Sequence, residues 1–362
     1  MTTAQQSEDT TALAPRSALE VAEVKAQRQL STFGEYSPAA IRLKNDIVTD
    51  QVEATKHLQS VIADGTFTLE TARVCLAGER ERLAKYKRKE RPAIMRSEGK
   101  PFARTIMTQL WTDEKLWGPL VSDDHLHTGN LCYFAIFEGL ESFLVDWLRA
   151  EIDQPFVPEK EHMWRGHLLG SMVLAHAALS IGHELDEAIR CMFRVETLRR
   201  RLTAEAPEDQ RPATAYLSLR PSVSILTKQI MTGQFRHTDE RLYNEFCSLA
   251  TRYRSKSYTE RLEKNYRQAA FSLYHPKSPD HRLALACLKE NVAQATTPED
   301  LKILRNMMGL SNISLKRFIL RAAYLASRST HHADATFIRE QGLRLQQVST
   351  ALPYDRYKTV GI

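Results

Sequence analysis

The 362-residue chain has few of the residues that build turns between short strands. It contains 14 glycines and 14 prolines, whereas an all-β chain needs turn residues about every 8 to 12 positions. Leucine, alanine, arginine and glutamate, which favour helices, are abundant instead. We therefore predict an all-α protein.

Long hydrophobic runs are also missing. The longest weakly polar run, residues 168–182, is interrupted by two serines and a histidine and is shorter than the roughly 18 to 20 residues of a bilayer span. The first fifteen residues carry Glu8 and Asp9 and no lysine or arginine, unlike a secretory signal or a transit peptide. We predict no membrane span and a cytoplasmic or nuclear location.

Catalytic motifs are absent as well. The five cysteines are scattered and form no C-x-x-C pair, so we expect reduced, buried thiols. The chain has no G-x-G-x-x-G, G-x-x-x-x-G-K-[ST], H-E-x-x-H or G-x-S-x-G motif. No sequence motif nominates a catalytic residue, a metal ligand or a cofactor site, and we expect none of the three.

Two histidine patterns resemble the spacing of metal ligands. Glu159 and His162 have the E-x-x-H spacing of di-iron bundles, but such a site needs a second motif and further carboxylates. His176 and His183 lie seven residues apart on either side of Gly182, in an alanine-rich stretch. We expect the first pattern to form surface ion pairs and the second to be packed histidines.

Apolar residues from Ser37 onward follow a helical repeat. Ser37-Pro38 and Thr297-Pro298 resemble helix starts, and residues 68–90 predict one long helix. Further helices form pairs, predicted over 130–137 and 140–150, 168–181 and 186–194, 222–231 and 239–253, 262–274 and 281–293, and 297–308 and 314–327, before a last helix over 334–348. We predict a flexible tail over 1–37, a single helical domain over 38–348 and a polar end over 349–362.

One of these pairs resembles a known repeat family. Residues 182–189, GHELDEAI, resemble the turn and second helix of a tetratricopeptide or pentatricopeptide unit, and residues 138–144, EGLESFL, resemble it more faintly. The turn glycines Gly139, Gly182 and Gly233 are 43 and 51 residues apart, unlike the family's period of about 34. The resemblance implies irregular antiparallel helix-hairpin repeats in a right-handed superhelix-like array that binds peptides or RNA.

The net charge of +6 conceals opposite charges along the chain. Residues 105–188 carry a net charge of −10 and all four tryptophans, whereas residues 79–104 carry +6 and residues 189–362 carry +13. The oppositely charged halves either face each other or face different partners.

Two basic strips are candidate contacts for nucleic acid or another anion. The first includes Arg88 and Lys89, although cations also favour a solvated helix end. In the second, basic residues alternate with tyrosines, which suits phosphate contact and base stacking but equally suits packing between helices. Its candidate residues are Arg252, Arg254, Lys256, Tyr258 and Arg261.

Three functions follow from these patterns. The leading hypothesis is a non-enzymatic helical-repeat scaffold that binds a protein partner. The alternative is an RNA-associated helical-repeat protein that uses the second basic strip. A second alternative is an α-helical enzyme with an unrecognised pocket near Trp147, Trp164, His162 and His167. No feature of the sequence specifies an oligomeric state.

Overall fold

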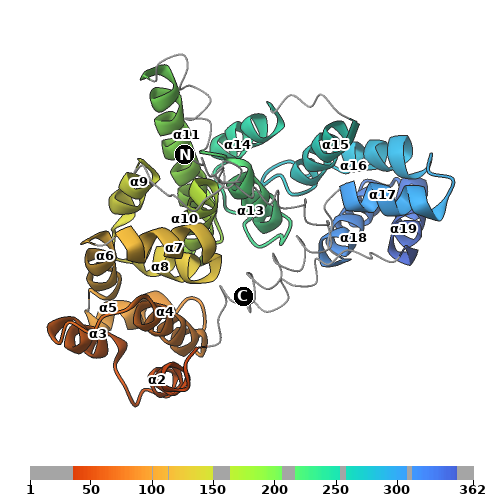
Figure 1. The fold of residues 1–362 in the computed structure, drawn as a ribbon. Coiled ribbons are helices and arrows are strands. Elements are labelled where there is room, and N and C mark those ends of the chain that lie inside the picture. The colour runs from red at the N-terminus through yellow and green to blue at the C-terminus, as the bar shows by residue number, and fades with distance from the viewer. Residues whose placement is uncertain are drawn as a thin grey trace, which may run out of the picture.

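Helices joined by short turns make up the regular structure of this protein. The computed structural model describes residues 36–99, 101–112, 114–149, 164–205, 217–252, 258–307 and 312–348. Within these ranges the chain forms 17 α-helices, one π-helical turn and no strand (Figure 1), which confirms the all-α prediction. No helix of the described ranges is both long enough and apolar enough to cross a lipid bilayer.

The helices follow a bent path from α2 at the lower left of Figure 1, through α10 and α11, to α19 at the right. The first group is α2 (Pro38–Val48), α3 (Ala54–Ala63), α4 (Leu69–Ala84), α5 (Arg91–Glu98), α6 (Phe102–Thr112), α7 (Glu114–Asp123), α8 (His125–Phe137) and α9 (Glu141–Arg149). The second is α10 (Trp164–Leu179), α11 (Asp186–Glu205), α13 (Arg220–Ile230) and α14 (Glu240–Arg252). The last is α15 (Tyr258–Leu273), α16 (Arg282–Cys287), η1 (Leu288–Val292), α17 (Pro298–Met307), α18 (Asn312–Arg328) and α19 (His332–Gln347).

Each predicted pair corresponds to two successive helices, beginning with α8 and α9 and ending with α17 and α18. The first helices of neighbouring pairs pack on one another, α8 on α10, α10 on α13, and α13 on α15. The two predicted helix starts are also confirmed. The side chain of Ser37 accepts a hydrogen bond from the Ala40 N–H, and Thr297 and Asp300 bond reciprocally to each other's backbone N–H groups.

The prediction of a single helix over residues 68–90 is wrong. Helix α4 ends at Ala84 and α5 begins at Arg91. Pro92 occupies the first turn of α5, where it has no N–H to lose, but it disfavours a helix that runs in from the residues before it. The Arg91 side chain also donates to the carbonyls of Tyr86 and Ala84 at 3.0 and 3.3 Å, which satisfies acceptors that the end of α4 leaves free.

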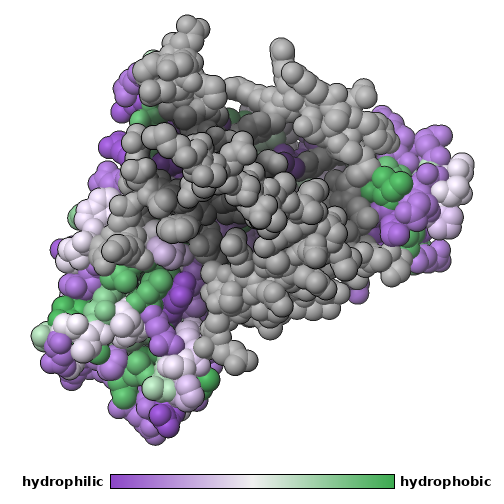
Figure 2. Space-filling view, viewed as in Figure 1, coloured by the Kyte–Doolittle hydropathy of each residue, from purple (hydrophilic) through white to green (hydrophobic). Residues whose placement is uncertain are grey.

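The buried side chains form two clusters rather than one continuous core. The first extends from α2 to α14 and includes Phe271 of α15, and the second contains Met231 and other residues of α15 to α19. Within the first cluster the Tyr243 hydroxyl donates to the Phe271 carbonyl at 2.7 Å, and within the second the Tyr266 hydroxyl donates to the Met231 sulfur at 3.2 Å. Tyr274 packs against both clusters. On the face shown in Figure 2, hydrophobic residues of α2 to α5 are scattered among hydrophilic ones.

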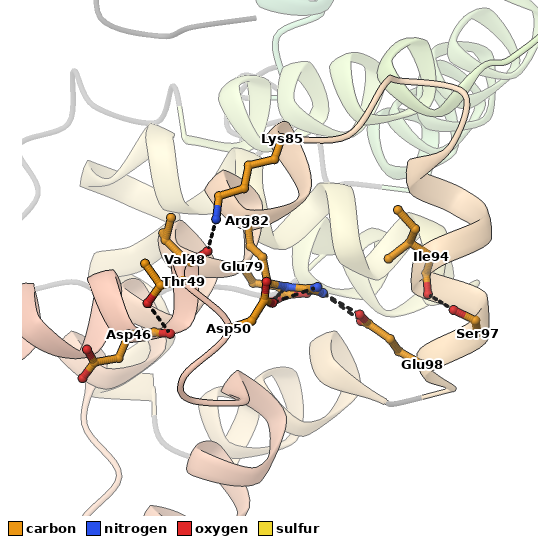
Figure 3. A network of polar contacts seen from close by, with 10 residues as sticks. All are labelled: Asp46, Val48, Thr49, Asp50, Glu79, Arg82, Lys85, Ile94, Ser97 and Glu98. Carbon is orange, nitrogen blue, oxygen red and sulfur yellow. Dashed lines mark hydrogen bonds and ion pairs between the residues drawn. The ribbon is translucent and has the colours of Figure 1, made fainter.

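A buried arginine joins α4, α5 and the turn after α2 (Figure 3). The Arg82 guanidinium donates to both oxygens of Glu79 at 2.6 and 2.9 Å and to both oxygens of Glu98 at 2.8 and 2.9 Å. It also reaches Asp50 at 3.4 Å. Arg82 and Glu79 are 9% and 8% exposed, so the buried Glu79 carboxylate depends on Arg82 for its counter-charge.

We expect Arg82→Met to destabilise the protein by about 3 kcal/mol, because it leaves the Glu79 carboxylate buried without its counter-charge. The control is Lys44→Met, which removes an ion pair to Glu81 whose two side chains are 28% and 54% exposed; this change should cost no more than about 1 kcal/mol. Urea unfolding followed by circular dichroism measures both. Equal losses in the two variants would contradict the role given to Arg82.

Helices α10 and α13 approach closely because α10 carries a glycine at their contact. A Cβ atom on Gly166 would lie 2.8 Å from the Ser218 carbonyl oxygen and 3.2 Å from Cγ of Pro221. The Ser218 oxygen belongs to the backbone and cannot move away by a side-chain rotation. Any larger residue at position 166 therefore pushes the two helices apart.

We therefore expect Gly166→Ala to destabilise the fold by about 1–3 kcal/mol. Gly129→Ala in α8 is the matched control, since the nearest atom to its added Cβ is 4.0 Å away, and alanine there should stabilise the helix by roughly 0.5–1 kcal/mol. In thermal unfolding we expect the melting temperature to fall for Gly166→Ala and to rise for Gly129→Ala. A neutral or stabilising Gly166→Ala variant would show that α13 is not held this close.

Candidate functional site

A cleft of about 540 Å³ lies at the boundary of the two core clusters. Three segments form it: the end of α13 with the turn that follows, the turn between α15 and α16, and one face of α18. Its lining is rich in aromatic and basic side chains, namely Phe235, Tyr243, Tyr274, Tyr324, Arg236, His275, Arg321 and Arg328. Apolar Ile230 and Leu325 complete the wall on the two sides.

Local backbone geometry positions the tyrosines. Gly233 lies in the turn after α13 with a φ of +70°, a conformation that residues with a Cβ rarely adopt. The Tyr274 ring lies against it, 3.4 Å from where a Cβ would be. Tyr243 is fixed at both ends, because its hydroxyl donates to the Phe271 carbonyl and its ring packs edge-on against His275 at 5.3 Å.

His275 holds the turn between α15 and α16. Its Nδ1 accepts the Ser278 N–H at 2.9 Å, and its Nε2 lies 3.2 Å from the Asn244 side-chain oxygen. Nδ1 therefore carries no proton, and Nε2–H donates to Asn244. In this tautomer both ring nitrogens are bonded within the protein, so His275 shapes the cleft and leaves ligand binding to its neighbours.

The α18 wall presents arginine and tyrosine on one helical face, since Arg321, Tyr324 and Arg328 are three and four residues apart. The Arg321 guanidinium lies 5.8 Å from the ring centres of both Tyr274 and Tyr324, and that of Arg328 lies 6.0 Å from Tyr324. The Arg321 Nε donates to the Leu273 carbonyl at 3.2 Å. This bond fixes Arg321, whereas Tyr324 remains 49% exposed.

The cleft carries positive charge from Arg236, Arg321 and Arg328. Among the described residues, no carboxylate lies within 4 Å of the guanidinium groups of Arg236, Arg321 or Arg328. The lining contains no aspartate or glutamate. Burial raises the pKa of Tyr274, against the opposing effect of Arg321 and Arg317, so this tyrosine stays neutral. The cleft therefore suits a ligand with negative charge and a flat ring.

Arg88 of the first basic strip lies beside this cleft. Arg88 donates through Nε to the Ala178 carbonyl at 3.0 Å and through Nη2 to the Ala177 carbonyl, which caps the end of α10. Its guanidinium lies 5.6 Å from the ring centre of Phe235 in the cleft wall. Burial, with Arg91 nearby, lowers the pKa of Arg88. Arg88 is thus occupied by structural bonds, while Lys89 is exposed.

The second basic strip is described only in part. Arg252 lies on α14, and Tyr258 and Arg261 lie on α15. Arg254 and Lys256 lie outside the described residues. The neighbouring Tyr266 is 4% exposed and belongs to the second core cluster. Tyr266 therefore packs between helices and is not available to stack on a base.

The residues expected near an enzyme pocket do not line this cleft. Trp147 is 1% exposed and stacks on Trp111 with ring centres 5.9 Å apart. Trp164 is also buried, and His162 lies outside the described residues. His167 is half-buried on α10, with its ring centre 4.1 Å from that of His125.

A buried polar chain fixes the first described residue to α8. The Tyr36 hydroxyl donates to Nε2 of His127 at 2.5 Å, and His127 Nδ1 donates to the Asp124 carboxylate at 2.7 Å. Asp124 also caps α8 and pairs with Arg73 at 2.6 Å. Burial, then the Asp124 charge, raises the pKa of Tyr36 to about 12, so the hydroxyl keeps its proton and serves as an anchor.

Comparisons of this chain with protein-family models, with curated proteins and with solved structures found no match. The chemistry of the cleft therefore rests on its own residues. Sequence reasoning missed this site, although one signal for it was present: Arg317, Arg321, Tyr324 and Arg328 recur at intervals of four, three and four residues along one face of a predicted helix.

Burial, together with the charge of His125, lowers the pKa of His167 to about 4 from its usual 6.5. We expect an NMR titration to place its midpoint near pH 4. Because the unfolded chain takes up this proton first, stability should fall as the pH drops from about 6.5 to 4. His125→Asn should raise the midpoint, whereas replacing exposed His332 should not. A midpoint near 6.5 in the unmodified protein would show that the ring is solvated.

Proposed function

We propose that this protein is a non-enzymatic helical scaffold that binds single-stranded RNA in the cleft between its two core clusters. The observation that carries the proposal is a set of arginines that lie around exposed and half-buried tyrosine rings and that have no carboxylate partner in the described part of the chain. Tyrosine faces stack with unpaired bases, and guanidinium groups bind phosphates. Both residue types converge here from helices that are far apart in the sequence.

The size and shape of the cleft support this ligand. Its volume of about 540 Å³ falls within the range of about 300–1,000 Å³ that holds small ligands, so it has room for a nucleotide-sized group. Tyr324 is 49% exposed and lies between Arg321 and Arg328. A base on Tyr324 would place its phosphates beside these two cations.

The surroundings of the cleft extend the positive surface. Phe235 in its wall contacts Arg88, so the basic turn between α4 and α5 begins at the rim. Lys87 and Lys89 on this turn are exposed. A single strand that continues beyond the cleft would meet them, and each phosphate that they neutralise adds affinity that falls with salt.

The protein-partner hypothesis remains the competing proposal, and an acidic peptide is the partner that would suit this charge. RNA is favoured because the aromatic side chains in the cleft are mainly tyrosines with guanidinium groups beside them, a combination that binds bases and phosphates together. An acidic peptide would use the charges without using the ring faces. The two partners therefore differ in their dependence on Tyr324.

Binding of a labelled single-stranded RNA of mixed sequence, measured by fluorescence anisotropy at several salt concentrations, tests the proposal. We expect Tyr324→Ala to weaken binding by about 1–3 kcal/mol. The double variant Arg236→Gln, Arg328→Gln should lower the slope of log affinity against log salt by roughly 1.4, since each lost contact to a single strand contributes about 0.7.

The matched control is Arg339→Gln, which removes an exposed arginine of α19 that does not line the cleft. It should leave both affinity and salt slope within error. RNA binding that is unaffected by the cleft variants would refute the site. If RNA does not bind but a polyglutamate peptide binds in a manner sensitive to Arg236 and Arg328, the protein-partner hypothesis replaces this one.

A further inference from the structure

Three potential metal ligands meet where α9, α10 and α11 pack, away from the cleft. They are Glu141 in the first turn of α9, His176 in the last turn of α10 and Cys191 in α11. One ligand atom from each, a carboxylate oxygen, an imidazole nitrogen and the thiol sulfur, lies within 4.8 Å of the other two. They are the one such group of three or more among the described residues.

From this geometry we infer that Glu141, His176 and Cys191 form a zinc-binding site with three protein ligands. In a tetrahedral site, zinc lies about 2.0–2.3 Å from nitrogen, oxygen and sulfur, which places neighbouring ligand atoms about 3.4–3.6 Å apart. His176 Nε2 and a Glu141 oxygen are already 3.1 Å apart. The thiol needs to approach by no more than about 1.5 Å to complete the set.

The ligand types favour zinc over harder cations. Thiolate and imidazole together select zinc among common divalent ions, whereas magnesium and calcium require oxygen ligands. Burial, then the Glu141 charge, raises the pKa of Cys191, so the thiol is protonated before the ion arrives. Binding forms a zinc–sulfur bond and releases this proton to solvent.

Arg194 holds the carboxylate in place. Its Nη2 lies 2.7 and 2.9 Å from the two oxygens of Glu141, and its Nε lies 3.1 Å from Oε1. Oε2 is the oxygen that faces His176. Carboxylate ligands in metal sites are commonly oriented by such hydrogen bonds. With a thiolate and a carboxylate present, the site keeps two negative charges against one arginine.

The site is open on one side. The side chains of Glu141 and His176 are 22% and 11% exposed, whereas Cys191 is fully buried. An ion can therefore reach the carboxylate and the imidazole from solvent, and water can take the fourth position. Three protein ligands with one open position are typical of zinc sites that bind a further ligand or substrate.

The test uses the full-length chain, stripped of metal with a chelator and titrated with Zn²⁺ against a chromophoric competitor, and separately with Co²⁺. We expect one equivalent of zinc and the near-ultraviolet charge-transfer absorption of a thiolate–cobalt bond. Cys191→Ser should abolish this absorption and weaken zinc binding by more than about tenfold, the loss that even an outer hydrogen-bond partner can cause.

The matched control is Cys287→Ser, which removes a buried thiol in α16 of the second cluster and should bind zinc as the unmodified chain does. If Cys191→Ser does not fold, His176→Gln answers the same question, because it removes a ligand near the surface and should also weaken zinc binding by more than about tenfold. Zinc binding that is absent, or equal in the unmodified chain and the ligand variants, overturns the inference and leaves Glu141, His176 and Arg194 as an ion-pair network.

Discussion

The close contact between α10 and α13 is the constraint on which the arrangement of the chain depends. Helix α10 packs against α7, α8, α9, α11 and α13, and Gly166 allows its backbone to approach that of the Ser218 segment. The far end of the same helix serves both proposed sites. Its last carbonyls accept Arg88, which brings the basic turn to the cleft wall, and its last turn carries His176 toward Glu141. A shift of α10 would displace both.

The polar interactions of this protein fall into two kinds. Arg82, Asp124 and Glu141 are buried or half-buried charges whose partners come from other helices, and they fix how helices pack. Burial alone would raise the pKa of Glu141, but hydrogen bonds from His176 and Arg194 outweigh it and lower that pKa to about 2. The cleft arginines are of the other kind, because they gather around tyrosines and have no described carboxylate partner. The positive charge of these arginines is therefore available to attract an anionic ligand.

Local signals in the sequence predicted the helices well, because caps and turn residues act within a few positions. Ser37 and Thr297 start helices as expected, and Gly139 and Gly233 lie in the turns after α8 and α13 with positive φ. The break after Ala84 was missed because the charged residues before Pro92 suit a helix equally well. Neither site was predicted, since each depends on helices that meet only after folding. Glu141, His176 and Cys191 are separated by 35 and 15 residues, spacings that no local rule connects, and His176 alone resembles an ordinary packed histidine.

The position of the cleft on the boundary between two hydrophobic clusters links occupancy to cooperativity. Separately packed clusters can open and refold as partly independent units, and here Tyr274 packs against both. A molecule that contacts Phe235 on one wall and Tyr324 on the other binds only when both units are folded together. Its binding free energy then favours the joint state over every state with one unit open. A ligand bound in the cleft would therefore make the two hydrophobic clusters unfold together in a single transition.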